Sequence, residues 1–271
     1  MILNKLSLDF KQNGYIITSL PTLINQIDKI NKKIDLLIKK KDFKTNPKAF
    51  HYNKSPRIVE AWKNILEIRK IAYNKTLIKL LKKLKNNKEP IPFSSINFMK
   101  GTEQPMHSDY IHFATLPHNY LLGVWIAMED INKDSGPLAI VEKSHKFPIL
   151  TNEKLSLTIP KNEIELKKNY TVYENYVKKL INKNKCEIKE LPIKKGQLII
   201  WDANLLHGAL KIKNKTLSRK SMVLHYHFAG CKKYFNPIYS LTSKHVFAYR
   251  DLNKLKIKKT NEKISNFENN I

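Results

Sequence analysis

Hydrophobic positions follow a helical period in the first third of the chain. Apolar residues recur every three to four positions within residues 21–41, which predicts a helix with a proline near its start. A second helix is predicted to begin after Ser55-Pro56, with the serine as N-cap and the proline in the first turn, and to fade near residue 86. Ahead of both, residues 13–17 combine an Asn-Gly turn signal with β-favouring residues and predict a short strand.

From Pro90 onward the pattern changes to short apolar runs separated by Gly, Pro, Asn and Asp turns. Such runs predict strands, and therefore a β-sandwich or barrel with helices on its N-terminal side. The runs are SSINFM, YLLGVWIAM, LAIV, QLIIW and SMVLHYHF.

A segment rich in Lys, Asn and Glu, residues 151–185, interrupts these strands and is predicted to be partly helical around Tyr173–Ile181. Long connections at the rim of a β core often bind substrate, so this insertion is a candidate lid. The tail, residues 251–271, is polar and rich in lysine, and we expect it to fray.

The whole pattern predicts a single domain over residues 1–250. Its helices occupy about residues 20–86 and its β core about residues 90–230. A chain of 271 residues is long enough to bury a core of this kind, and a 42% share of hydrophobic residues excludes a disordered chain.

The charge is strongly positive, with 50 Lys and Arg against 23 Asp and Glu and a net charge of +27. Only four of these cations are arginines, which argues against nucleic-acid binding, because such surfaces usually use the bidentate arginine fork. We interpret most of the lysines as solvated helix faces in a chain of biased composition. An acidic substrate or an anionic surface partner is the alternative.

Two cysteines, Cys186 and Cys231, are too few for a disulfide framework or a multi-thiolate zinc site. A reducing compartment follows as the default, so we expect a cytoplasmic protein. No apolar run approaches the roughly 20 residues that a membrane-spanning helix needs, and the first residues, MILNKLSLDFKQNG, show no sustained apolar region of a secretory signal.

Candidate chemistry concentrates in His107 and Asp109 of QPMHSDYIHF and in His207 of WDANLLHGAL. On a strand, positions i and i+2 face the same side, so the first two side chains would lie together. A histidine from a second strand would complete two imidazoles and one carboxylate, the facial triad of non-haem Fe(II) oxygenases. Three of six octahedral positions then stay open for a chelating co-substrate and O2.

An arginine is expected near this triad. Arg219 lies twelve residues after His207 and opens a predicted strand, where it shares one face with Ser221, Val223, His225 and His227. An arginine inside a barrel needs an anion, and a dicarboxylate co-substrate would supply one through a bidentate pair.

The ordered motifs MHSD, GVWIAMEDINKDSGPLAIVEKSHK, GQLIIWDANLLHG and SRKS, with FKQNGYIIT ahead of them, resemble the phytanoyl-CoA dioxygenase family of Fe(II)- and 2-oxoglutarate-dependent oxygenases. The resemblance extends over about residues 10–230 and implies a double-stranded β-helix (jelly-roll) core. It gives iron-ligand roles to His107, Asp109 and His207, and it makes Arg219 the partner of the 2-oxoglutarate C5-carboxylate.

The resemblance also implies smaller roles. Ser221 would assist the same carboxylate, and Trp125 matches an aromatic position that the family places beside the co-substrate, although a plain core tryptophan is an equal alternative. Two departures stand out. The family's Pro-Gly-Ser-His turn is Glu-Lys-Ser-His here, residues 142–145, and Ala209 occupies the place of a serine that contacts the co-substrate in some relatives.

Other histidines have simpler interpretations. His225 and His227 are the best rival metal pair, but they lack a nearby carboxylate in the sequence. His112 would point to the opposite face of the strand from His107 and serve structure. His118 and His145 lie in turns, and nothing in the sequence assigns them a contact with substrate.

The sequence therefore predicts a 2-oxoglutarate-dependent hydroxylase that acts on an unactivated C–H bond of a small-molecule or lipid-like substrate and releases succinate and CO2. Asp109 favours hydroxylation over halogenation, because a halogenase needs that ligand position vacant for halide. The alternatives are a catalytically silent jelly roll that binds an anionic partner and a cupin-type metal enzyme without 2-oxoglutarate. The lysine excess would suit a carboxylated, phosphorylated or CoA-linked substrate, and biased composition explains it equally well.

Overall fold

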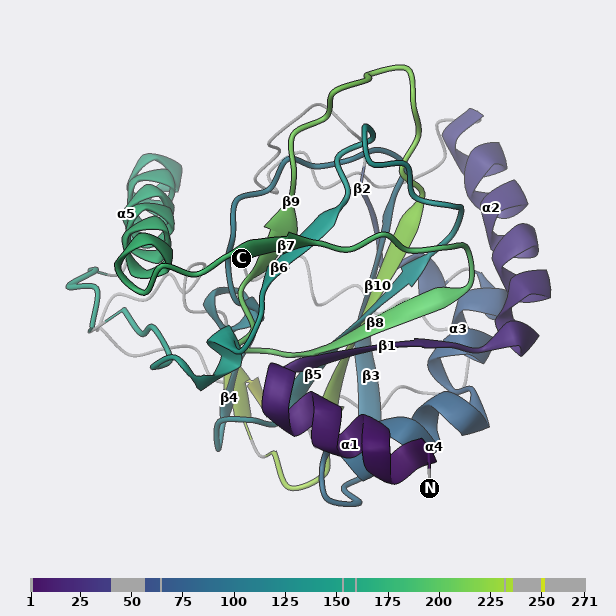
Figure 1. Ribbon diagram of the computed structural model, residues 1–271, viewed down its shortest axis with the longest axis horizontal. Helices are drawn as coiled ribbons and strands as arrows, with labels where there is room; N and C mark the ends of the chain where they lie inside the picture. Colours follow the sequence, from purple (N-terminus) through teal and green to yellow (C-terminus); the bar gives the residue numbers. More distant parts are fainter. Residues whose placement is uncertain are drawn as a thin grey trace.

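Two facing antiparallel sheets form the centre of the computed structural model, which describes residues 2–39, 57–63, 65–152, 154–158, 160–231, 233–235 and 250–251 (Figure 1). The larger sheet has six strands in the order β1-β8-β5-β10-β3-β2. These strands are β1 (Tyr15–Ser19), β8 (Gln197–Asp202), β5 (Leu121–Ala127), β10 (Ser221–Phe228), β3 (Pro90–Phe98) and β2 (Arg57–Val59).

A smaller sheet, β7-β6-β9, faces the large one. Its strands are β7 (Ile188–Glu190), β6 (Leu138–Val141) and β9 (His207–Ala209). Trp125, Ile199 and Val223 of the large sheet share one buried cluster with Leu138 and Ile140 of the small one. This packing of two antiparallel sheets over a common interior is the predicted jelly roll, and it confirms a mainly β fold with flanking helices. A third, short sheet joins β12 (Arg250–Asp251), β11 (Lys233–Phe235) and β4 (Ala114–Leu116).

Four helices cover the outer face of the large sheet. They are α1 (Ile2–Asn13), α2 (Ile24–Lys39), α3 (Leu66–Ala72) and α4 (Lys75–Leu84). Alternate residues of the central strands, such as Val124 and Ile126, point into this helical layer, while Trp125 between them points into the space between the sheets. Helix α5 (Glu163–Lys183) lies apart from these helices, on the side of the small sheet (Figure 1).

The structure corrects the predicted second helix. Residues Arg57–Val59 form strand β2, paired with β3, and the chain then runs through a 3-10 turn, Ala61–Lys63, before α3 begins. Pairing with an existing strand edge overrides the helical spacing of these apolar residues. A break at Asn74 separates α3 from α4, because its side chain accepts hydrogen bonds from the amides of Thr76 and Leu77 and so caps a new helix. Ser55 and Pro56 lie outside the described residues.

The other predicted elements differ mainly in extent. The helix predicted over residues 21–41 corresponds to α2, which follows a 3-10 turn over Pro21–Leu23. The strand predicted over residues 13–17 corresponds to β1. The helical part of the insertion is longer than predicted, since α5 has 21 residues. Helix α1 was not predicted. Most of the predicted tail, residues 252–271, lies outside the described part of the chain, and the domain boundary at residue 250 stays a prediction.

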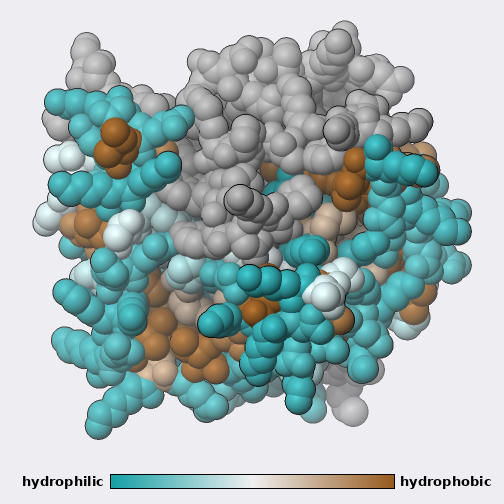
Figure 2. All heavy atoms as spheres, turned by 90° about the horizontal axis from the view of Figure 1, so that it is seen from above, coloured by the Kyte–Doolittle hydropathy of each residue, from teal (hydrophilic) through white to brown (hydrophobic). Residues whose placement is uncertain are grey.

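The lysine-rich surface is largely hydrophilic where it can be seen. Figure 2 shows a face on which hydrophobic residues gather only in small, separate patches among the described residues. Several lysines pair with acidic side chains of another element, for example Lys33 with Glu67 and Lys220 with Asp35. Within the described ranges, none of the helices has the length and apolar character that crossing a bilayer requires.

Candidate metal centre

The side chains of His107, Asp109 and His207 meet between the two sheets. Each offers one ligand atom, these atoms all lie within 4.8 Å of one another, and all three residues are buried. His107 and His207 form an isolated antiparallel bridge in which each backbone amide donates to the other's carbonyl at 2.9 Å. This bridge brings together two histidines that are a hundred residues apart.

Asp109 reaches the same point by a different route from the one predicted. It begins a 3-10 turn, Asp109–Ile111, rather than continuing a strand. The prediction that His107 and Asp109 lie together is therefore right, but its premise of strand periodicity is wrong. The turn, and not the pleat, brings the carboxylate to the side of the imidazole.

Both imidazoles are oriented by carbonyl groups two residues earlier in the chain. His107 Nδ1 lies 2.8 Å from the carbonyl oxygen of Pro105, and His207 Nδ1 lies 2.9 Å from that of Leu205. A ring nitrogen that faces a carbonyl oxygen must carry the proton, so each Nδ1 donates and each Nε2 keeps its lone pair. This is the usual outer support of a metal-binding histidine.

The Asp109 carboxylate is held from two sides. Trp201 Nε1 donates a hydrogen bond to Oδ2 at 2.7 Å, and Oδ1 lies 3.6 Å from Nε2 of both His207 and His225. Trp201 stands opposite Gly123 in the pairing of β8 with β5, and a side chain at Gly123 would overlap the indole. The glycine thus gives the tryptophan the room from which it reaches Asp109.

Burial and mutual proximity set the charge of the three groups. Burial lowers the pKa of His107 well below its usual value, with His207 and His112 adding to the effect, and burial also lowers the pKa of His207. Burial alone would raise the pKa of Asp109, but the neighbouring His207 and His225 and the hydrogen bond from Trp201 lower it overall. The site therefore holds neutral imidazoles and an ionised carboxylate, the protonation states that metal binding requires.

Arg219 lies inside the fold, two residues before the start of β10 at Ser221. It is 3% exposed, and its Nη1 donates to the Ser221 hydroxyl at 3.1 Å. Its guanidinium carbon lies 5.8 Å from the centre of the Trp125 ring. Burial lowers the pKa of Arg219 to about 10, so it stays charged at neutral pH. Its Nε makes no hydrogen bond within the described ranges, so a buried donor is left for a ligand.

A second arginine, which the sequence did not single out, lies close to the first. The guanidinium carbons of Arg57 and Arg219 lie 5.4 Å and 5.9 Å from the centre of the Phe98 ring. Arg57 also donates to Gln104 Oε1 at 3.5 Å, and Gln104 Nε2 lies 3.2 Å from His107 Nε2. An amide donor at that nitrogen agrees with a lone pair on Nε2, and a metal ion bound there would replace this amide contact. The rarity of arginine was the one available sequence signal for Arg57.

The other histidines fall into three groups. His112 is closer to the site than predicted, because its ring lies edge-on to His107 with centroids 5.4 Å apart. His225 contacts Asp109, and His227 stacks on Phe93 at 4.0 Å, but the cluster that could hold a metal includes neither. His118 lies edge-on to a tyrosine, and His145 Nε2 lies 3.2 Å from a backbone carbonyl oxygen of α1.

The departures from the family pattern are accommodated locally. In Glu-Lys-Ser-His, Lys143 occupies the position of the family's glycine and adopts a φ of 65°, the left-handed conformation that glycine favours. Ser144 keeps its place, since its hydroxyl donates to Val141 and accepts from the amide of Leu206 next to His207. Ala209 lies in β9.

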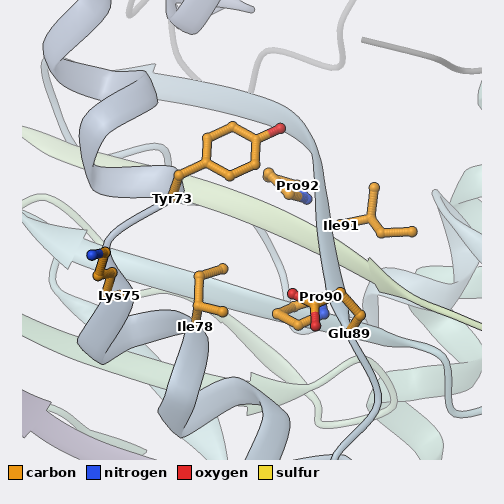
Figure 3. Close-up of a pocket in the computed structure, with 7 residues that line it drawn as sticks. All are labelled: Tyr73, Lys75, Ile78, Glu89, Pro90, Ile91 and Pro92. Atoms are coloured by element: carbon orange, nitrogen blue, oxygen red, sulfur yellow. The ribbon is translucent and has the colours of Figure 1, made fainter.

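A surface groove of about 360 Å³ lies elsewhere, between helix α4 and strand β3 (Figure 3). Tyr73, Ile78 and Ile91 are among its lining residues, and none of the three candidate metal ligands lines it. It belongs to the helical side of the large sheet.

The donor set itself points to a metal. Two imidazole nitrogens and one carboxylate oxygen from the same small region suit Fe(II) with positions left open, and the buried guanidinium of Arg219 suits a carboxylate. The residues present thus fit both an iron ion and a dicarboxylate co-substrate.

Comparison with known proteins agrees with an iron- and 2-oxoglutarate-binding site. The sequence model of the family described as phytanoyl-CoA dioxygenase matches residues 23–221. The peroxisomal phytanoyl-CoA dioxygenase of Rattus norvegicus is 25% identical over 197 residues, 73% of this chain and 51% of that protein. A probable phytanoyl-CoA dioxygenase of Caenorhabditis elegans is 26% identical over 200 residues, 74% of this chain and 57% of that protein. The chain thus matches little more than half the length of these relatives.

Solved structures with the same fold are more distant in sequence. The α-ketoglutarate-dependent carbocyclase SnoK of nogalamycin biosynthesis superposes with a TM-score of 0.64 at 13% identity, covering 85% of each chain. EctD from S. alaskensis, solved with 2-oxoglutarate and 5-hydroxyectoine, gives 0.59 at 16% identity, covering 89% of this chain and 80% of its own. The epimerase SnoN with Fe3+ and α-ketoglutarate gives 0.61 at 15% identity, covering 86% of this chain and 85% of its own.

Proposed function

The chain belongs to the phytanoyl-CoA dioxygenase family, and from that premise we propose that it is an Fe(II)- and 2-oxoglutarate-dependent dioxygenase. Its reaction would hydroxylate an unactivated C–H bond of a small-molecule or lipid-like substrate, with release of succinate and CO2. The observation that carries the proposal is the meeting of His107, Asp109 and His207, all buried, with ligand atoms within 4.8 Å of one another.

The three side chains would bind the iron as two neutral imidazoles and one ionised carboxylate, the protonation states described above. Each imidazole presents Nε2, because its Nδ1 is engaged by a carbonyl, and Asp109 presents Oδ1, because Oδ2 accepts from Trp201. When bound, iron and 2-oxoglutarate together would supply the activation of O2 that no protein side chain can provide. The chain's own contribution is then to orient these ligands and to exclude water, which the burial of all three residues supports.

Arg219 would bind the distal carboxylate of 2-oxoglutarate. Its unsatisfied Nε and its remaining guanidinium donors can form a bidentate pair with a carboxylate. Ser221 would fix the guanidinium through its hydrogen bond to Nη1, and the Trp125 ring would support the same group from the side. Arg57 strengthens the case, because two like charges near Phe98 repel each other and a bound anion offsets that repulsion.

Hydroxylation is supported by the carboxylate ligand, since halogenation would need the position of Asp109 for halide. The substrate stays open within the small-molecule or lipid-like class, and the lysine content is compatible with an anionic one. We further propose one dioxygenase domain over residues 1–250, supported by the family match over residues 23–221. A cytoplasmic location rests on the low cysteine content alone, while the rat relative is described as peroxisomal.

Anaerobic addition of Fe(II) and 2-oxoglutarate tests the proposal. The wild-type protein should develop the weak visible charge-transfer absorption of the chelate and should form succinate when air is admitted. His107→Ala should lose metal binding. Arg219→Gln should bind Fe(II) normally but need at least ~10-fold more 2-oxoglutarate, because a charge-assisted pair is lost. Arg69→Gln, which removes an arginine of helix α3, is the matched control and should behave as wild type.

The alternative function is a catalytically silent jelly roll that binds an anionic partner through its basic surface. It predicts no absorption and no succinate from the wild-type protein, with binding to an anionic polymer that weakens steeply as salt is raised. That combination of results would replace the enzyme by a binding module.

A further inference from the structure

Helix α5 packs against the segments that carry all three candidate metal ligands. Its buried face shares one apolar cluster with Ile111, Val141 and Leu206, and Met106 lies against that cluster. Met106 directly precedes His107, Ile111 follows Asp109 by two residues, and Leu206 directly precedes His207. The insertion thus contacts the chain beside every ligand.

The inward face of α5 consists of buried side chains at regular helical spacing. Tyr170, Tyr173, Val177 and Ile181 are buried, at helical spacings of three and four residues. The N-terminus of the helix is closed by Asn162, whose side chain accepts from the amide of Glu165, while the Glu165 carboxylate accepts from the amide of Lys161. A capped helix with a buried stripe forms a wall beside the ligand segments, and the role of the insertion as a substrate lid stays a prediction.

One hydrogen bond links this wall directly to the ligand segment. The backbone amide of Ser108, the residue between His107 and Asp109, donates to the Tyr173 hydroxyl at 2.8 Å. Ser108 is 4% exposed and Tyr173 is fully buried, so water cannot replace either partner. A buried amide without an acceptor is costly, and this amide belongs to the short stretch whose geometry sets the distance between two ligands.

We propose that Tyr173 of α5 is a positioning residue for the metal centre, which acts by fixing the backbone between His107 and Asp109. The inference rests on the proposed metal site and adds to it a contribution from an inserted helix. Removal of the hydroxyl frees the His107–Asp109 segment to relax when no metal is bound, so metal binding must restore the ligand geometry each time. Outer groups that orient metal ligands typically change the affinity about 10- to 100-fold.

The test uses Co(II) alone, a redox-stable probe whose visible spectrum reports ligand geometry. Tyr173→Phe removes one oxygen atom and keeps the ring, and we expect the Kd for Co(II) to rise about 10-fold and the Co(II) absorption bands to shift. Tyr176→Phe is the matched control, because it makes the same change one turn along α5 at an exposed tyrosine. The control should bind Co(II) with the wild-type Kd and spectrum.

A purely structural role gives a different result. Tyr173→Phe would then lower the melting temperature of the metal-free protein and leave the Kd and the Co(II) spectrum unchanged, which would overturn the inference. Should this variant not fold, 3,5-difluorotyrosine at position 173 keeps the hydroxyl as a weaker acceptor, and the Kd should rise by a smaller factor. An unchanged Kd with the fluorinated residue also overturns the inference.

The two proposals fail in distinguishable ways. If the wild-type protein binds Co(II) and His107→Ala does not, the metal site stands whatever the outcome at Tyr173. If the wild type binds no more Co(II) than His107→Ala, the metal site is wrong, and the positioning role of Tyr173 is wrong with it.

Discussion

A single hydrogen bond determines how the Asp109 carboxylate faces the candidate metal. Trp201 Nε1 donates to Oδ2 at 2.7 Å, and this leaves Oδ1 toward His207. The indole makes this bond while fully buried, and the other close neighbours of the carboxylate, His207 and His225, lie on the side of Oδ1. Its contribution is therefore orientation, which the metal ligand would otherwise lack.

We expect Trp201→Phe to weaken metal binding about 10-fold, because the carboxylate loses the donor that fixes its rotation. Isothermal titration calorimetry with Mn(II) measures this loss directly. Trp62→Phe is a suitable control, since Trp62 also donates its indole N–H to a carboxylate, that of Glu60, at 2.8 Å in the helical layer. Equal Mn(II) affinities for the two variants would show that the Trp201 bond serves stability alone.

Residue types and spacing predicted the candidate ligands, but not the groups that support them. His107, Asp109 and His207 stand in recognisable motifs, and Arg219 is one of only four arginines. Trp201 and Tyr173 act on partners 92 and 65 residues away, so no local pattern could pair them. These contacts exist only after the sheets and α5 have packed.

At the scale of the elements, the pairing of β5 with β8 fixes the position of Trp201. Gly123 lies directly opposite Trp201 in this antiparallel pair, and the indole occupies the space that a Cβ at Gly123 would need. The backbone of one strand thus serves as the platform for the side chain of the next. Two neighbouring strands must keep this register for the Asp109 hydrogen bond to form.

Gly123→Ala should therefore affect both stability and metal binding. The added methyl group displaces the indole, so we expect the free energy of unfolding to fall by about 1–3 kcal/mol and the Mn(II) affinity to fall as it does in Trp201→Phe. Urea unfolding and calorimetry measure the two effects. Gly196→Ala, in the turn before β8 at a φ of 82°, should lose stability through backbone strain and keep the wild-type Mn(II) affinity. A Gly123→Ala protein with normal affinity would contradict this account.

Elements with a strongly periodic hydrophobic pattern could be predicted from the sequence. Elements whose conformation depends on pairing with another segment could not. Helix α2 and the central strands follow their hydrophobic patterns. Strand β2 has the apolar spacing of a helix, yet it is extended because the free edge of β3 accepts it. The 3-10 turn at Asp109 is likewise invisible in an H-x-D motif, although the motif itself predicts which side chains meet.

At the scale of the whole molecule, the family and the jelly roll expected from the motifs are confirmed. The interior carries a distinct electrostatic feature. His107, His207 and His227 are buried, and burial lowers the pKa of each, so charging any of them in the folded state would be costly. The stability of the protein should for this reason fall in acid, before its carboxylates are protonated.

His227 allows this expectation to be tested away from the candidate ligands. Burial lowers the pKa of His227 to about 3, and its surroundings are the Phe93 ring, the backbone of Tyr120 and the imidazole of His225. An unfolded histidine has a pKa of about 6.5, so between these values the unfolded state binds one more proton than the folded state. Stability contributed by neutral His227 is thus complete above pH 6.5 and is lost as the pH falls toward 3.

From pH 7 to pH 5 this single histidine should lower the free energy of unfolding by about 2 kcal/mol. His227→Gln keeps a polar side chain that does not titrate, so its unfolding free energy should depend less on pH by that amount, even if the variant is less stable at both pH values. Urea unfolding of the metal-free proteins at the two pH values gives the comparison. Parallel losses in wild type and variant would mean that His227 takes up its proton over the same pH range in the folded and the unfolded protein, and that its burial against Phe93 tolerates the charge.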